Sequence, residues 1–74
     1  MPHITISAVP GHNVEEKARL AEKIAELTAA EFHVPQDIVS VSMQEISKSE
    51  WSAFMKQFPK EKLLIIPPYL EDTP

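Results

Sequence analysis

Two alternating segments on either side of one long helical pattern constrain the fold of this chain more than any other feature of its sequence. Residues 3–8 alternate polar and apolar side chains, and residues 38–46 alternate in the same way. Alternation of this kind predicts strands with one buried face. A helix that joins two such strands makes a βαβ unit, in which the strands run parallel and the crossover is right-handed.

The segment between the strands predicts a single amphipathic helix over residues 14–32. Its apolar side chains recur at steps of three and four, and its charged side chains gather on the opposite face. Asn13 suits the N-cap of this helix, and Glu16 stands at the spacing of a capping box. Pro35 cannot continue a helix and drives the preceding residue out of helical geometry, so we expect the helix to end near His33.

A second, shorter helix is predicted over residues 50–58, where Pro59 stops it. Its apolar side chains recur on one face, at Trp51, Phe54, Met55 and Phe58. Ser47 has the spacing of a capping box to Glu50. Residues 63–66 favour a short strand, and an acidic tail follows.

The chain has 74 residues and is predicted to form a single domain, residues 1–74, with a marginal core. A chain of this length removes only about 60% of its unfolded surface from water. There is no Cys and the three His are scattered, so we predict no disulfide, metal ion or cofactor that could compensate. The expected fold is therefore α+β, with two parallel strands, one long helix, a short second helix and a sheet completed by homo-oligomerisation.

Charge and hydropathy exclude several classes of partner. The net charge of −4 argues against nucleic acid or an anionic membrane as the main partner. The longest apolar run, residues 63–66, is far too short to cross a bilayer. No basic region followed by an apolar run marks a signal peptide, and we expect a soluble cytoplasmic protein.

Pro2 is a candidate for chemistry because it stands at the start of the first predicted strand. Removal of Met1 would leave Pro2 as a secondary amine held by the fold. A solvated α-amino group titrates at about 7.7 to 8.0, and an apolar pocket disfavours its charged form, so the neutral base would be populated near neutral pH. Such a group can move protons on and off carbon. With Met1 attached, the same nitrogen is an amide without useful basicity.

Taken together, the landmarks of the chain resemble those of the 4-oxalocrotonate tautomerase family. The likeness covers about residues 2–51, and the tail beyond it resembles the dimeric phenylpyruvate-tautomerase-like branch. The landmarks are the strand at Pro2, the Pro10-Gly11 loop, the capped helix, the Val34-Pro35 break, the second strand and Trp51. In that family the proline nitrogen is the general acid or base, two arginines bind a dicarboxylate 2-oxo acid, and an aromatic residue packs over the site.

The resemblance implies a role for four residues of this chain. Pro2 falls on the catalytic proline and Trp51 on the aromatic residue, whereas His12 and Ser40 stand where the family has its two arginines. Without those arginines a dicarboxylate loses its bidentate clamps. The resemblance therefore implies a keto–enol tautomerase for a smaller or monoanionic 2-oxo acid with an apolar or aromatic side chain, as in phenylpyruvate. Pro2 would move the proton between oxygen and C3, while His12, Ser40 or backbone amides would stabilise the enolate.

Two other functions stay open. Sister groups of the same superfamily use the proline for decarboxylation or dehalogenation, reactions that generally want a cationic clamp and an acid that activates water. The third interpretation is a catalytically silent oligomeric module, in which Met1 is retained and Trp51 only holds subunits together. Ser40 would then be an ordinary residue of the strand surface, and His12 a solvated loop residue.

The assembly is predicted to be a homodimer, with a hexamer as the alternative. Trimers of dimers are typical of the resembled family where a Gly-rich hairpin follows the second strand, but here residues 50–58 predict a helix and no Gly follows Gly11. Such a helix would occupy the surface on which dimers otherwise meet. It should also bring Trp51 of one chain near Pro2 of the other, so that the pocket forms on assembly.

Overall fold

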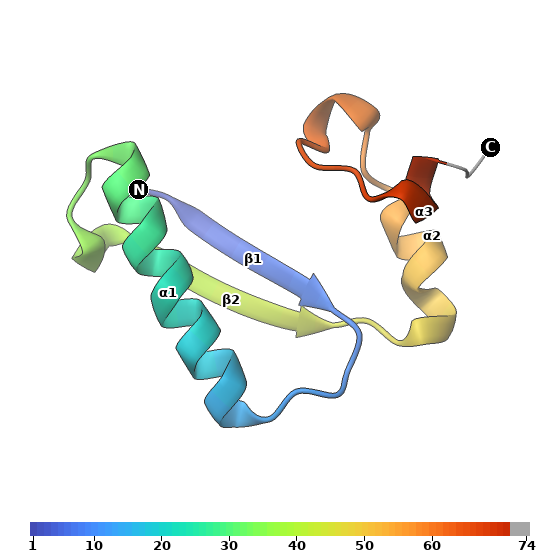
Figure 1. The fold of residues 1–74 in the computed structure, drawn as a ribbon, viewed down its shortest axis with the longest axis horizontal. Coiled ribbons are helices and arrows are strands. Elements are labelled where there is room, and N and C mark those ends of the chain that lie inside the picture. The colour runs from blue at the N-terminus through green and yellow to red at the C-terminus, as the bar shows by residue number, and fades with distance from the viewer. Residues whose placement is uncertain (72–74) are drawn as a thin grey trace.

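The computed structural model describes residues 1–71, which contain a two-stranded sheet, one long helix and two short helices. In chain order the elements are β1 (His3–Ala8), α1 (Val14–Phe32), β2 (Ser40–Glu45), α2 (Trp51–Met55) and α3 (Pro68–Glu71). Figure 1 shows α1 lying against the sheet, while α2 and α3 lie beyond one end of it. The predicted βαβ unit and the short second helix are therefore confirmed.

The sheet is parallel, as the long helical connection predicts. Its register sets His3 beside Ser40 and Ile6 beside Met43. Ile6 and Met43 are half-buried on the face that α1 covers, whereas His3 and Ser40 are exposed on the opposite face. Within the described chain that opposite face is open.

Both ends of α1 are closed by the residues that the sequence indicates. The Asn13 side chain accepts from the Glu16 N–H (2.8 Å), and the Glu16 carboxylate accepts from the Asn13 N–H (3.1 Å), which completes the capping box. At the other end His33 adopts left-handed geometry, with φ 56°. This lets the Val34 N–H donate to the Ala29 carbonyl (3.1 Å) in the manner of a Schellman motif.

The helix α2 is shorter than the one predicted over residues 50–58. A 3₁₀ turn, Lys48–Glu50, leads into it, and the N–H groups of Gln57 and Phe58 bond to carbonyls three residues back rather than four. Pro59 explains the early end, because the residue before a proline is driven out of helical geometry and the last turn tightens.

The capping box predicted between Ser47 and Glu50 is not formed. The Ser47 hydroxyl donates to the Glu50 carboxylate (Oγ···Oε1 2.7 Å) and makes no bond to a backbone N–H of the turn. The Ser47 and Glu50 side chains thus hydrogen-bond to each other and not to the backbone of the turn. The helix α2 lies beyond the end of the sheet (Figure 1), and its predicted role in excluding a hexamer stays a prediction.

The short strand predicted over residues 63–66 is wrong. After a 3₁₀ turn at Lys60–Lys62 the chain bends, and Leu64 and Ile65 are 92% and 89% exposed. An apolar run becomes a strand only where another strand can take its backbone hydrogen bonds, and no described edge lies beside this one. Pro68 then begins α3, at the first helical position that proline favours.

The core is as thin as the chain length predicts. Ala29, on the sheet side of α1, is the one apolar side chain that is buried among residues 1–71. The radius of gyration is 14.2 Å, against about 11 Å for a compact chain of this length. No helix in the described part of the chain combines the length and apolar character needed to cross a membrane.

Candidate active site

Pro2 and Ser40 lie together at the end of the sheet where β1 and β2 begin. The Ser40 N–H donates to the Pro2 carbonyl (3.2 Å), and Pro2 itself is half-buried. Met1 projects from this end and is 97% exposed. The parallel register therefore places the Ser40 hydroxyl, at the start of β2, beside the start of β1, which Pro2 directly precedes.

His3 is the site residue to which sequence reasoning gave no role. One ring nitrogen, Nδ1, is hydrogen-bonded to the Ser40 hydroxyl, and the other, Nε2, to the Ser42 hydroxyl (3.0 Å). The tautomer decides which nitrogen donates and which accepts. The strand register sets His3 directly beside Ser40, and the His3 ring then holds the Ser40 hydroxyl by a hydrogen bond. Only the register could have shown this, because His3 and Ser40 stand 37 residues apart.

Polar contacts continue along the open sheet face from this pair. Thr5 Oγ1 lies 3.0 Å from the Ser42 hydroxyl, and the Gln44 amide donates to the Ser7 hydroxyl (2.8 Å). Apart from the titratable ring of His3, the side chains of this face carry no charge. The surroundings of Ser40 therefore offer hydrogen bonds but no guanidinium or ammonium group.

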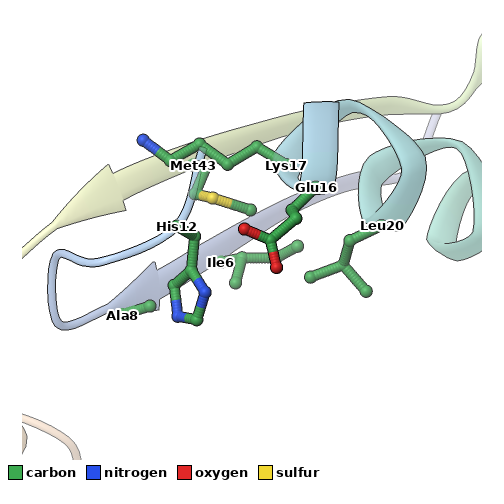
Figure 2. Close-up of a pocket in the computed structure, with 7 residues that line it drawn as sticks. All are labelled: Ile6, Ala8, His12, Glu16, Lys17, Leu20 and Met43. Atoms are coloured by element: carbon green, nitrogen blue, oxygen red, sulfur yellow. The ribbon is translucent and has the colours of Figure 1, made fainter. Parts of the chain in front are cut away.

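His12 lies at the other end of β1, in the loop before α1. The rise from His3 to Ala8 is about 17 Å, so His12 is remote from Pro2 of the same chain. It lines a pocket of about 260 Å³ together with Ile6, Ala8, Glu16, Lys17, Leu20 and Met43. Figure 2 shows the His12 ring and the Glu16 carboxylate beside the apolar side chains of this pocket, with the Lys17 amine directed away from them. That amine pairs with Glu45 (2.7 Å), at the end of β2.

Trp51 also lies beyond the end of the sheet away from Pro2, on α2. Its indole N–H donates to the Tyr69 hydroxyl (3.1 Å), and its ring lies 5.6 Å from the ring of Phe54. The bond to Tyr69 holds α3 against α2. Trp51 lines a second pocket, of about 430 Å³, with Val9, Lys48, Ser52, Tyr69 and Leu70.

The four residues singled out in the sequence thus fall into two groups within one chain. Pro2 and Ser40 lie at the start of the sheet, and His12 and Trp51 lie at or beyond its far end (Figure 1). Bringing both groups around one substrate takes a second copy of the chain. No cluster of three His, Cys, Asp or Glu that could hold a metal ion lies within residues 1–71.

A protein-family model and three known proteins match the part of the chain that contains these four residues. A family model described as "Tautomerase enzyme" matches residues 2–54, which include Pro2, His12, Ser40 and Trp51. The chain is 35% identical over 54 residues to Tautomerase PptA from Enterobacter sp. (strain 638), covering 72% of this chain and 71% of that protein. Probable tautomerases from Bacillus cereus and Bacillus anthracis are each 29% identical over 52 residues, covering 70% of this chain and 85% of each relative.

Proposed function

The chain belongs to the tautomerase family and is a tautomerase-type isomerase, and from this premise we propose that Pro2 interconverts the keto and enol forms of a small 2-oxo acid. The acid would carry an apolar or aromatic side chain, as phenylpyruvate does. The observation that carries the proposal is the position of Pro2, half-buried at the head of β1 with the Ser40 backbone bonded to its carbonyl.

Loss of Met1 is the first requirement of this mechanism, because it converts the amide nitrogen of Pro2 into a secondary amine. The exposure of Met1 leaves its peptide bond accessible to an aminopeptidase. Half-burial of the proline disfavours the charged amine, which keeps a neutral base available near neutral pH. In ketonisation the enol gives up its O–H proton and C3 gains one, so that one nitrogen can serve as base and then as acid.

Ser40 is proposed to hold the oxygen on which charge develops. A fixed hydroxyl donor aimed at an enolate lowers the barrier because it costs no reorganisation when the charge forms. His3 fixes this hydroxyl in the free protein. His12 and Trp51 would come to the site from another copy of the chain, with Trp51 packing over the apolar part of the substrate.

The uncharged surroundings of Pro2 favour a monoanionic substrate over a dicarboxylate. A second carboxylate would need its own cation, and the open sheet face beside Ser40 offers hydroxyl and amide groups instead. Neither a hydroxyl nor a neutral imidazole replaces the planar fork of an arginine. The side-chain end of the substrate is therefore expected to be apolar.

The proposal is tested with protein from which Met1 has been removed, as checked by mass spectrometry. This form should ketonise phenylenolpyruvate, followed by the loss of enol absorbance, about 10²- to 10⁴-fold faster than a Pro2→Ala variant, the usual contribution of a positioned acid or base. Nitrogen NMR of the processed protein should give a pKa for the Pro2 amine below that of a solvated α-amino group. Equal rates for the processed protein and the variant would contradict the proposal.

A further inference from the structure

The pocket beside Trp51 is built from parts of the chain that are far apart in sequence. Its walls come from Val9 just after β1, from the 3₁₀ turn and start of α2, and from α3, and the bond from Trp51 to Tyr69 joins the α2 and α3 walls. Its volume of about 430 Å³ lies within the range of small-molecule sites, about 300 to 1,000 Å³. The pocket therefore has the size that a small ligand needs.

The chemistry of this lining is that of a site for an apolar anion. Trp51 and Tyr69 supply aromatic surface, and Val9 and Leu70 supply aliphatic surface. Among residues 1–71, no acidic side chain lines the pocket and Lys48 is its one cation. Pockets that bind small molecules combine apolar walls with a few polar or charged groups in the same way.

Lys48 is also free to take an anion. Within residues 1–71 it has no ion-pair partner, although the chain as a whole carries a net charge of −4. Glu50, its nearest acidic neighbour in sequence, accepts from the Ser47 hydroxyl instead. The pocket beside His12 differs, because there the Lys17 amine is paired with Glu45 and the Glu16 carboxylate faces the apolar lining.

We propose that the Trp51–Tyr69 pocket is the subsite for the carboxylate and side chain of the substrate, with the Lys48 ammonium pairing with the carboxylate. Lys48 then supplies the positive charge that His12 and Ser40 do not. This inference rests on the proposed function, because it assigns the pocket to the same 2-oxo acid. The reacting carbon meets Pro2 of another copy of the chain at the mouth of the pocket.

Binding is tested through the fluorescence of Trp51, since the chain contains one Trp. Processed full-length protein is titrated with 3-phenylpropanoate and, as a neutral isostere, with 3-phenylpropanamide. The carboxylate should quench or shift the emission saturably and bind about two- to fivefold more tightly than the amide, as expected for an exposed ion pair. Lys48→Gln should abolish this preference and Lys48→Arg should retain it. Lys23→Gln, the same charge change on the solvent face of α1, should leave it unaltered.

Kinetics on the same variants decide whether the pocket serves the substrate. Lys48→Gln should raise KM for phenylenolpyruvate by a similar factor with kcat within about twofold, whereas Lys23→Gln should change neither. The inference is overturned if carboxylate and amide bind the wild type equally, if Lys48→Gln keeps the preference, or if its KM is normal. Lys48-dependent binding in a protein with no tautomerase activity would instead contradict the proposed function and support the carboxylate site. Circular dichroism checks that the variants are folded.

Discussion

His3 joins two serine side chains of the open sheet face, and for Ser40 it is the one side-chain partner among residues 1–71. Its ring bonds to the hydroxyls of Ser40 and Ser42, one on each nitrogen. A serine side chain has three staggered rotamers, and a partner of fixed position selects one of them. If the Ser40 hydroxyl stabilises the enolate, as proposed, then His3 is a positioning residue that acts through Ser40.

The double-mutant cycle of His3 and Ser40 tests this role. We expect His3→Ala to lower kcat for phenylenolpyruvate about three- to tenfold, because the Ser40 donor loses its fixed direction. His3→Ala combined with Ser40→Ala should then be no slower than Ser40→Ala alone. Ser7→Ala, on the same face but hydrogen-bonded to Gln44 rather than to His3, Ser40 or Ser42, is the matched control. Additive losses in the double variant would show that His3 acts independently of Ser40.

At the scale of elements, α1 is the part of the chain whose stability is most locally determined. Asn13 and Glu16 satisfy each other's backbone N–H groups, and His33 ends the helix in left-handed geometry. The body of the helix contributes little burial, with Ala29 as the buried apolar residue of the described chain. The capped ends of α1 therefore add to the stability that its half-buried sheet-facing side supplies.

An Asn13→Ala variant should lower the free energy of unfolding by about 1 kcal/mol, the usual cost of losing an N-cap side chain. Asn13→Ser keeps an oxygen acceptor and should lose much less. Urea denaturation at one fixed protein concentration measures both, because association contributes to the apparent stability. Equal losses in the two variants would contradict the view that the side-chain acceptor oxygen stabilises the helix.

At the scale of the whole molecule, a single copy leaves too much surface in water. The chain, of 8.3 kDa, exposes 6059 Å², whereas a compact monomer of this mass exposes about 4,600 Å². The excess of about 1,500 Å² per chain amounts to about 3,000 Å² over two chains, which lies within the range of obligate homodimers. Large apolar side chains are part of that surface, among them Leu27, Phe32, Leu64 and Ile65.

Sedimentation equilibrium at micromolar concentration should therefore show an associated species and no stable monomer. We expect a homodimer, since one obligate interface accounts for the excess surface. A hexamer would contradict the dimer while leaving the chemistry of Pro2 intact. A stable monomer would contradict association itself, and with it the proposal that Trp51 and Pro2 of different chains share one pocket.

Features that depend on neighbours a few residues apart could be predicted from the amino-acid sequence. The alternation in residues 3–8, the capping pair Asn13 and Glu16, and the stop before Pro35 are local, and the structure confirms the strand, the cap and the helix end. Family membership could likewise be predicted from the sequence, because it follows from the order of these local features along the chain. Each of them is fixed by backbone sterics or by hydrogen bonds within about one turn of chain.

Features that depend on contacts between distant parts of the chain could not be predicted in this way and are seen in the folded structure. The bond from His3 to Ser40 follows from the strand register, and the pocket at Lys48 exists because Tyr69 folds back onto Trp51. The apolar run at residues 63–66 failed as a strand for the same reason, since a strand requires a partner edge that no local pattern supplies. Side chains many residues apart meet only once the backbone between them is placed, and their chemistry becomes visible at that point.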